Sequence, residues 1–219
     1  MLFDDRSDAG RTLARIVAKL PNLENAIVLG LPRGGVPVAF EVALACRLPF
    51  DVLLARKLGV PLFRELAFGA VASGGAFVLN REVLREFRIS KDMILSTVRR
   101  EMEEIEWREH EYRQAYPRMR IEGKTVILVD DGLATGATMK AAVRAVRPQA
   151  ASVVVAVPVA APSSCSELAR VADQVLCVVA PDCFDAVGRY YLDFRPTIDE
   201  EVIALLAKAR ASTQAQPAV

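Results

Sequence analysis

The sequence is poor in the residues that bind structural metals: among 219 residues it has one histidine and four cysteines. The single histidine leaves no partner for a mixed Cys/His zinc cage, and no two cysteines have CxxC spacing. We therefore expect reduced thiols, mostly in the core, as in a cytosolic protein. The four positions are Cys46, Cys165, Cys177 and Cys183.

An excess of charge of one sign is also lacking, because 28 basic residues face 27 acidic ones. A formal net charge of +1 excludes the broad cationic field that nonspecific binding to nucleic acid or to membrane surfaces requires. The N-terminus is acidic where a secretory signal is basic, so we expect no export and a cytoplasmic location. The longest uncharged stretch, residues 148–166, contains three prolines, which favours a strand and a loop over a membrane span.

The chain has enough apolar material for one core, since 53% of its residues are hydrophobic. We predict a single domain over residues 1–210 and a disordered tail over 211–219. Short apolar runs alternate with amphipathic segments, which predicts an α/β fold: a mainly parallel open sheet flanked by helices. The predicted strands are 26–31, 51–56, 125–129, 152–157 and 174–179, and the predicted helices are 9–20, 36–46, 137–147, 163–171 and 198–210.

Residues 80–116 do not fit this alternation and look helical throughout, so we predict a helical insertion over about 80–117. Its polar face carries pairs spaced one turn apart, such as Glu104 and Arg108. We favour a solvated helix that packs on the sheet by one apolar stripe, with a lid or a dimer arm as alternatives. The stripe consists of Ile94, Val98, Met102, Ile105, Tyr112 and Tyr116.

The most informative window is VILVDDGLATGAT, residues 126–138, in which a predicted strand runs into two acids and a small-residue turn. Asp130 and Asp131 would lie at the edge where open α/β sheets bind ligands, and there they can accept hydrogen bonds from vicinal hydroxyls or hold a divalent cation through water. The amides of the turn can converge on an anion at the start of the next helix. The window therefore predicts a sugar phosphate site. The turn consists of Ala134, Thr135, Gly136, Ala137 and Thr138.

This turn is neither a Walker A loop, because Lys140 lies four residues after Gly136, nor a GxGxxG loop. The window instead resembles the PRPP-binding motif of the type I phosphoribosyltransferases, in which a hydrophobic strand precedes two acidic residues and a Thr-Gly-x-Thr turn. Gly132 stands where a bulkier apolar residue is common, a departure that should leave the pocket intact. The resemblance implies that Asp130 and Asp131 hold the ribose hydroxyls of PRPP and that residues 134–138 hold its 5-phosphate.

A second turn, GLPRGGVP at residues 30–37, follows the first predicted strand and opens the next helix. Gly34 and Gly35 allow close approach of the backbone, and Arg33 offers a planar fork of donors for phosphate. The turn resembles the pyrophosphate-binding loop of the same enzymes. That loop often carries a strained peptide bond, which we expect here at Arg33–Gly34.

Arg56 and Lys57 end the second predicted strand and would reach the same edge of the sheet, which favours contact with pyrophosphate. The next residues, 58–75, are rich in glycine and lack periodicity. In the family a flexible loop in this region closes over the reactants, and Arg64 and Glu65 are candidates for its functional side chains.

The resemblance implies an enzyme that transfers a phosphoribosyl group from PRPP to a nitrogenous acceptor with release of pyrophosphate, assisted by Mg²⁺. Asp130 and Asp131 would stabilise the positive charge on the ribose, directly and through Mg²⁺ held by way of substrate or water. Arg33, Lys57 and backbone amides would stabilise the leaving group. These four side chains are the predicted catalytic residues.

The acceptor site is less sharply defined by the sequence. Ala134 stands where the 6-oxopurine enzymes carry an aspartate that contacts the base, which argues against hypoxanthine or guanine. We predict a hood made from the N-terminal segment and residues 158–197, where Phe184 and Tyr190 could stack on a nucleobase or simply pack within the hood. The layout is similar to a bacterial group of predicted phosphoribosyltransferases of unassigned substrate.

Two alternative functions make different demands on the sequence. A PRPP-binding regulator without chemistry should show an added nucleic-acid-binding element or a basic face, and a metal-dependent phosphohydrolase or kinase should show an activating base or a lysine motif. The sequence shows neither set of features. We therefore expect an enzyme that acts on PRPP and a small molecule, with no nucleic acid or membrane as partner; a homodimer stays open.

Overall fold

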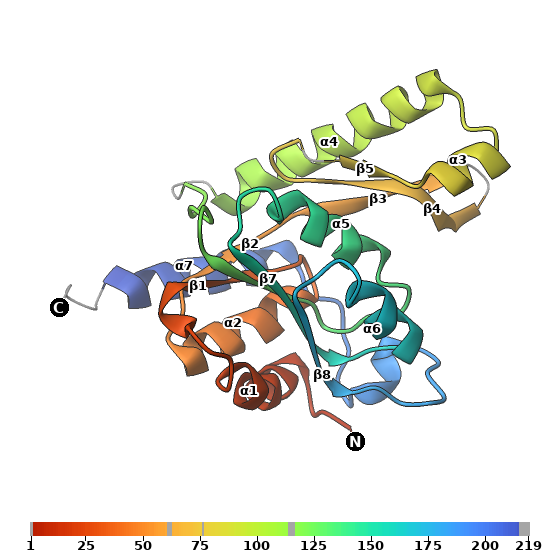
Figure 1. Cartoon of the computed structure of the whole chain (residues 1–219). Helices are drawn as coiled ribbons and strands as arrows, with labels where there is room; N and C mark the ends of the chain where they lie inside the picture. Colours follow the sequence, from red (N-terminus) through yellow and green to blue (C-terminus); the bar gives the residue numbers. More distant parts are fainter. Residues whose placement is uncertain (1, 61–62, 76, 114–116, 215–219) are drawn as a thin grey trace.

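The computed structural model describes residues 2–60, 63–75, 77–113 and 117–214, with the backbone alone for 63–65 and 212–214 (Figure 1). A five-stranded parallel sheet forms its centre, in the order β2-β1-β6-β7-β8. The predicted α/β class is therefore confirmed, and β6 and β8 have the predicted bounds. The strands are β1 (Ala26–Gly30), β2 (Phe50–Val52), β6 (Thr125–Val129), β7 (Ser152–Val159) and β8 (Gln174–Val179).

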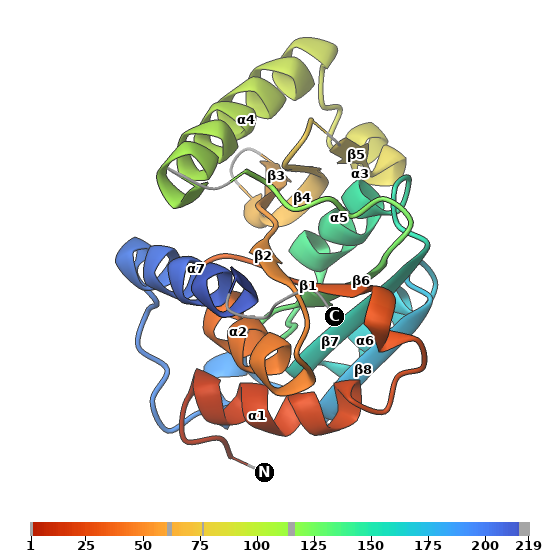
Figure 2. The same ribbon diagram turned by 90° about the vertical axis from the view of Figure 1, so that its left-hand side faces the viewer.

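Helices cover both faces of this sheet (Figure 2). Because successive strand residues point to opposite faces, Ile127 and Val154 pack with one group of helices and Leu128 and Val155 with the other. Burial on both faces explains why the strands read as continuous apolar runs. The first group is α1 (Arg6–Val17), α2 (Gly35–Cys46) and α7 (Asp199–Gln214), and the second is α5 (Ala137–Val146) and α6 (Pro162–Leu168).

A second, antiparallel sheet corrects two predictions. The predicted strand 51–56 is split, because β2 ends at Val52 and β3 (Ala55–Val60) turns away into this sheet. The predicted flexible loop, 58–75, is instead mostly β3 and β4 (Phe63–Ala72), and β5 (Phe77–Leu79) pairs with β4. Register shifts on both sides of Gly59 break the alternation of side chains, which hid the hairpin from a search for periodicity.

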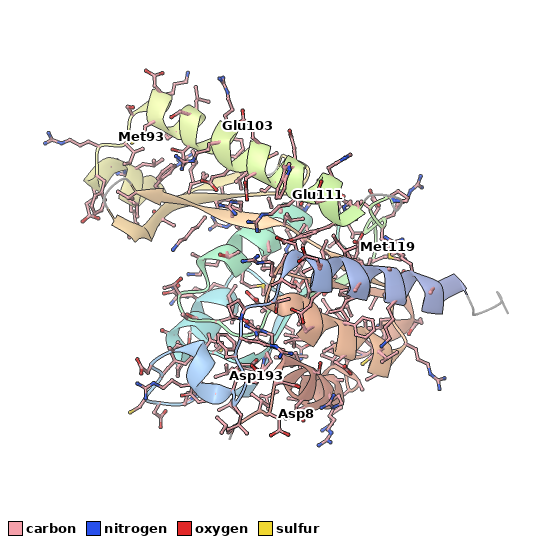
Figure 3. The ribbon with its side chains drawn as sticks, turned by 180° about the vertical axis from the view of Figure 1, so that it is seen from behind. Asp8, Met93, Glu103, Glu111, Met119 and Asp193 are labelled. Atoms are coloured by element: carbon pink, nitrogen blue, oxygen red, sulfur yellow. The ribbon has the colours of Figure 1, made fainter. Side chains whose placement is uncertain are left out.

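The predicted helical insertion consists of two helices, α3 (Arg81–Glu86) and α4 (Lys91–Arg113), rather than one continuous helix. Arg88 adopts a left-handed conformation with φ of 48°, which ends the first helix. Figure 3 shows α4 with Met93, Glu103 and Glu111 along its length, beside the antiparallel sheet.

The apolar stripe of α4 packs against the chain's own core, with Ile105 and Tyr112 buried. The prediction of a solvated helix that packs by this stripe is therefore confirmed, and a dimer contact through the same stripe loses its basis. Glu104 and Arg108 pair at 2.8 Å as the spacing predicts. Tyr116, the last predicted member of the stripe, lies outside the described residues.

The two chain segments of the predicted hood meet at the carboxyl edge of the parallel sheet. Phe3 forms a parallel bridge with Tyr191: its amide donates to Tyr190 O, and its carbonyl accepts from Leu192 N, both at 2.8 Å. Two short 3₁₀ turns complete the fold, η1 (Leu23–Asn25) and η2 (Val187–Tyr190).

The last helix, α7, continues to Gln214, so the predicted tail begins too early at 211. The rest of that predicted tail, 215–219, falls outside the described residues. Among the helices that the structure describes, none is both long and apolar enough to cross a bilayer.

Candidate active site

Asp130 and Asp131 follow β6 directly, at the carboxyl edge of the parallel sheet. Asp130 Oδ1 accepts a hydrogen bond from Asp131 N at 2.9 Å. Asp131 Oδ2 is held by Arg6 of α1, whose Nε and Nη2 lie 2.9 Å and 2.8 Å away. The guanidinium of Arg6 also donates to Arg195 O at 2.7 Å and lies 4.1 Å from the ring centroid of Phe194.

The surroundings of these carboxylates disfavour their ionised forms. Burial raises the pKa of Asp130 well above its ordinary value, and the charge of Asp131 acts in the same direction. Burial also raises the pKa of Asp131, although Arg6 opposes that shift. Tyr191 donates to Asp131 O at 2.6 Å, and burial, followed by the charge of Asp131, raises the pKa of this phenol. The cation beside the pair, Arg6, therefore offsets only part of the cost of burying these two negative charges.

The predicted pyrophosphate loop lies against this acidic pair. A Cβ added to Gly34 would lie 2.1 Å from Asp131 Oδ2, and one added to Gly35 would lie 2.7 Å from Asp130 Cα, so only glycine fits at both positions. The two strands are tied together here, since Leu31 N donates to Val129 O at 2.9 Å. The loop has a cis peptide bond at Pro32–Arg33, one bond before the position predicted to be strained.

Arg33, the predicted pyrophosphate ligand in this loop, is paired with a carboxylate of the last helix. Its Nη1 lies 3.4 Å from Asp199 Oδ2, and its side chain is 41% exposed. Tyr112 of α4 donates a hydrogen bond to the other oxygen of Asp199. Burial, followed by this hydrogen bond, raises the pKa of Tyr112, so the phenol remains a donor. One carboxylate thus joins the loop to α4 and α7.

The predicted phosphate turn starts α5. Gly136 has a left-handed backbone conformation with φ of 65°. The hydroxyl of Ser164 in α6 donates a hydrogen bond to Ala134 O, which holds the turn against α6. Ala134 and Thr135 are exposed, so this part of the turn is accessible from solvent. A Cβ added to Gly132 would lie 2.5 Å from Val187 Cγ1, so this departure from the family motif lets the hood pack closely.

Arg56 does not lie at the acidic pair in this structure. Its Nε is 2.5 Å from Glu101 Oε2 and its Nη1 is 3.8 Å from Glu104 Oε1, both on α4. Lys57 lies on β3 opposite Ala70. The side chains of Arg64 and Glu65 lie outside the described residues. Contact of Arg56 and Lys57 with pyrophosphate stays a prediction.

The two predicted base-side aromatics contact each other. The rings of Phe184 and Tyr190 stack with centroids 6.0 Å apart and planes 12° from parallel, and both pack against the cluster around Phe3 and Tyr191. This arrangement accounts for both rings by packing within the hood, and their role in base binding stays a prediction.

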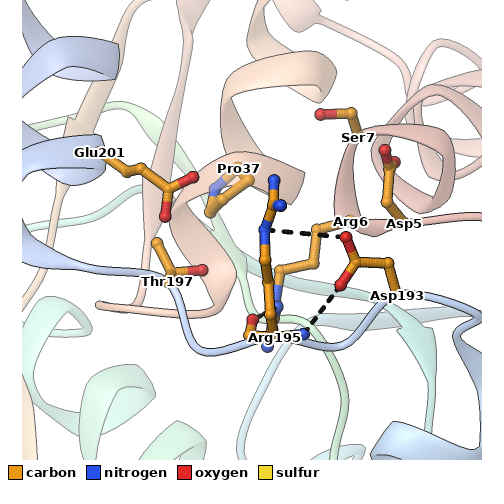
Figure 4. Close-up of a pocket in the computed structure, with 8 residues that line it drawn as sticks. All are labelled: Asp5, Arg6, Ser7, Pro37, Asp193, Arg195, Thr197 and Glu201. Carbon is orange, nitrogen blue, oxygen red and sulfur yellow. Dashed lines mark hydrogen bonds and ion pairs between the residues drawn. The ribbon is translucent and has the colours of Figure 1, made fainter.

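A small pocket of about 90 Å³ lies on the hood side of Arg6 (Figure 4). Arg195 extends into it, with its Nε 3.7 Å from Asp193 Oδ2. The hood therefore presents charged groups beside the aromatic cluster.

The acidic pair suits a magnesium ion that is held largely by substrate and water. Among the described residues, no group of three or more histidine, cysteine, aspartate or glutamate side chains could hold a metal by itself. Mg²⁺ commonly binds through one or two carboxylates together with water and substrate phosphates, and Asp130 and Asp131 supply that donor set.

The sequence did not reveal four side chains at this site: Arg6, Tyr112, Tyr191 and Asp199. They reach the site from distant parts of the chain: Arg6, for example, is 125 positions before its partner Asp131. Asp199 looked like one of several acids at a helix N-terminus, and nothing local distinguished it. Only the prediction that the N-terminal segment joins the hood pointed toward Arg6.

The fold is a parallel α/β sheet with an acidic pair and two glycine-containing loops at its carboxyl edge, which is where open α/β sheets bind their ligands. Residues 63–195 match the sequence profile of the family described as "Phosphoribosyl transferase domain". The chain belongs to this family. The match includes the acidic pair and the phosphate turn, whereas the pyrophosphate loop precedes it.

Relatives agree with this assignment. Proteins from two strains of Mycobacterium tuberculosis, CDC 1551 / Oshkosh and H37Rv, carry the provisional name of phosphoribosyl transferase and are each 46% identical over 95% of this chain. The alignment covers 47% of each of them, so the chain spans about half the length of the curated relatives it matches. The crystal structure of TT1426 from Thermus thermophilus is 43% identical, with a TM-score of 0.84 over 95% of this chain and 99% of that one.

Proposed function

We propose that this protein catalyses the Mg²⁺-dependent transfer of a phosphoribosyl group from PRPP to a nitrogenous acceptor, a nucleobase in our first choice, and releases pyrophosphate. The observation that carries this proposal is the contact between two loops: Gly34 approaches Asp131 so closely that an added Cβ would lie 2.1 Å from its carboxylate. A ribose bound by the carboxylates would therefore lie directly beside the loop proposed to hold pyrophosphate.

Each group of residues at the carboxyl edge of the parallel sheet has one task in this reaction. The carboxylates of Asp130 and Asp131 accept hydrogen bonds from the ribose hydroxyls, and the turn 134–138 donates amides to the 5-phosphate. The lone pair of the acceptor nitrogen forms a bond to ribose C1 while the bond from C1 to the pyrophosphate oxygen breaks. The electron pair of that bond leaves with pyrophosphate, and the acceptor nitrogen releases its proton.

Electrostatics favour the transition state, in which the ribose is cationic and the leaving group anionic. Asp130 and Asp131 stabilise the cation, while Arg33, Lys57 and loop amides stabilise pyrophosphate. Mg²⁺, when bound with PRPP, neutralises charge on the phosphates, and the two carboxylates would hold it through the ribose hydroxyls and water.

Substrate binding then requires an exchange of partners. Arg33 has to leave Asp199, and Arg56 has to leave Glu101 of α4. Both arginines are about one-third exposed or more, so these pairs contribute little to stability and can be exchanged for pyrophosphate at low cost. The cytoplasmic location remains part of the proposal, in agreement with four cysteines that form no disulfide.

A PRPP-binding regulator is the second candidate function. The observation that favours it is that Asp131 and Arg33, two of the proposed catalytic side chains, are engaged with Arg6 and Asp199 of the protein itself.

One experiment separates the two functions. The protein is incubated with PRPP and Mg²⁺ and a panel of purines, pyrimidines and small amines, and release of pyrophosphate is recorded. The transferase proposal predicts turnover with at least one acceptor. PRPP binding without turnover on any acceptor would reject it in favour of the regulator.

The site is tested by the double variant Asp130→Asn/Asp131→Asn. We expect PRPP affinity to fall by about 100-fold or more, since two charged hydrogen-bond acceptors are lost. The matched control is Asp182→Asn/Asp185→Asn on the exposed hood surface, which makes the same chemical change. Equal PRPP affinity in the two variants would show that the acidic pair is not the site.

A further inference from the structure

A cavity of about 750 Å³ that the proposed reaction does not use lies between α5, the β4–β5 hairpin and α3. Its volume lies in the range of sites for small molecules and cofactors. Residues of α5 at one-turn spacing, from Ala137 to Arg144, form one wall. Leu66, Ala67, Gly69 and Ala70 of β4 form the other.

The floor of this cavity is apolar and made of small side chains. Ala137 and Ala141 of α5 face Ala67 and Ala70 of β4, with Leu79 of β5 beside them. Ala70 and Ala141 are buried where α5 packs on β4, and the apolar surface that stays accessible comes from Leu66, Ala67, Leu79 and Ala137. Such a surface suits a planar ring rather than a flexible chain.

The rim of the cavity is basic. Arg81 and Arg85 of α3 and Lys140 and Arg144 of α5 line it, against the single carboxylate of Glu82. Lys140 is paired with Glu167 of α6. Within the described ranges, no carboxylate lies within ion-pair distance of the guanidinium groups of Arg81, Arg85 and Arg144. Three exposed arginines around one cavity thus lack an internal counter-ion, and an anion of two or more charges would complement them.

The cavity is distinct from the acidic pair, although the two sites are neighbours. Thr135 and Ala137 belong both to the predicted phosphate turn and to the cavity lining, whereas Asp130, Asp131 and Gly34 do not line the cavity. Along α5, Arg144 is seven residues after the start of the helix, or about 10 Å away. An anion at Arg144 would therefore leave the phosphate turn free.

We propose that this cavity is a second ligand site that binds a nucleoside phosphate, with the base on the apolar floor and the phosphate between Arg81, Arg85 and Arg144. The combination of a partly exposed apolar floor with a basic rim fits this class of ligand. Inorganic phosphate would use only the rim, and a nucleoside only the floor. The site does not depend on the catalytic function proposed above.

The test measures binding of AMP, GMP, CMP and UMP by calorimetry, with inorganic phosphate and adenosine as partial ligands. In the variant Arg81→Ser/Arg144→Ser, affinity for the bound nucleotide is expected to fall at least tenfold, while PRPP affinity is unchanged. The matched control is Arg11→Ser/Arg15→Ser on the exposed face of α1, which removes the same charge and should bind as the parent protein.

The variant Asp130→Asn/Asp131→Asn separates this site from the acidic pair. The proposal requires that it keep nucleotide binding. Loss of nucleotide binding in the aspartate variant but not in the arginine variant would place the nucleotide at the acidic pair and overturn the cavity site, with the proposed transfer reaction still standing. Failure of all four nucleotides to bind, or binding of inorganic phosphate with the same affinity, would also overturn it.

Discussion

Two aspartates of the parallel sheet, Asp51 on β2 and Asp131 just after β6, have different surroundings. Asp51 of β2 is 1% exposed and accepts hydrogen bonds from Arg113 Nη1 and Met119 N at 2.8–3.0 Å. Arg210 of α7 lies 3.5 Å away as a further cation. Asp131, at the end of β6, has only Arg6 as a side-chain partner among the described residues.

This difference separates a structural carboxylate from one that remains able to bind. The donors around Asp51 come from α4, α7 and the segment before β6, so its charge holds these elements together. The pair Asp130–Asp131 keeps unused acceptor capacity and raised pKa values, a cost that proteins tolerate at functional sites. Substitutions at Asp51 and at the acidic pair should therefore change the free energy of unfolding by different amounts and in opposite directions.

The largest effect is expected for Arg113→Met, which leaves Asp51 buried without its main partner. We expect the free energy of unfolding to fall by about 3–5 kcal/mol, measured by urea denaturation. Arg108→Met, on the same helix, is the control and should cost less than about 1 kcal/mol, because its pair with Glu104 is at the surface. Similar losses in both variants would refute the structural role of Asp51.

The next effect is expected for Gly34→Ala. The new Cβ would overlap the Asp131 carboxylate and push it away from Arg6. We expect a loss of about 1–3 kcal/mol in stability, together with a fall in PRPP affinity of about tenfold or more. A titration with PRPP that matches the parent protein would show that the loop and the acidic pair are not one site.

The opposite sign is expected for Asp130→Asn. The amide oxygen can still accept from Asp131 N, while the buried like charge is removed, so we expect a gain of about 0.5–2 kcal/mol at neutral pH. Because the pKa of Asp130 is raised in the folded protein, the folded chain holds more protons, and stability falls as pH rises above the unfolded pKa of about 4. The variant should lose this part of the pH dependence in denaturation series between pH 4 and pH 8. A destabilised variant would contradict the proposed contrast with Asp51.

The smallest effect is expected for Asp199→Asn. The carboxylate competes with pyrophosphate for Arg33, so its removal should tighten PRPP binding about two- to fivefold. Tyr112→Phe is the control, because it removes the hydrogen bond to Asp199 but leaves the charge beside Arg33. Weaker PRPP binding in Asp199→Asn would show that Asp199 positions Arg33 for the ligand instead of competing with it.

The parallel core could be predicted from the sequence because burial on both faces makes each strand a continuous apolar run. Of the two strands whose predicted bounds are confirmed, 125–129 is buried along most of its length, whereas 174–179 is a partly exposed edge strand that is still an apolar run. The antiparallel hairpin could not be predicted, because the register shifts around Gly59 break the alternation of side chains that marks a half-exposed strand. The helical insertion was recognised as helical, but the left-handed turn at Arg88 that divides it has no glycine to signal it.

For the site, the sequence located the two loops because each is a contiguous motif after a strand. It did not locate Arg6, Tyr191 or Asp199, since their contacts depend on how distant segments meet in three dimensions. The environment of Arg56 was also beyond the sequence, because Glu101 was one of many acids on a charged helix.

The bridge between Phe3 and Tyr191 has a consequence for the order in which the protein can mature during synthesis. At about 5–20 residues per second, the ribosome makes the first turn of α1 roughly 10–40 s before Tyr191 appears. Throughout this interval Phe3 has no partner for its bridge, and Arg6 lacks Phe194, whose ring centroid lies 4.1 Å from its guanidinium in the folded protein. The contact between the two segments of the hood can thus form only after most of the chain has left the ribosome.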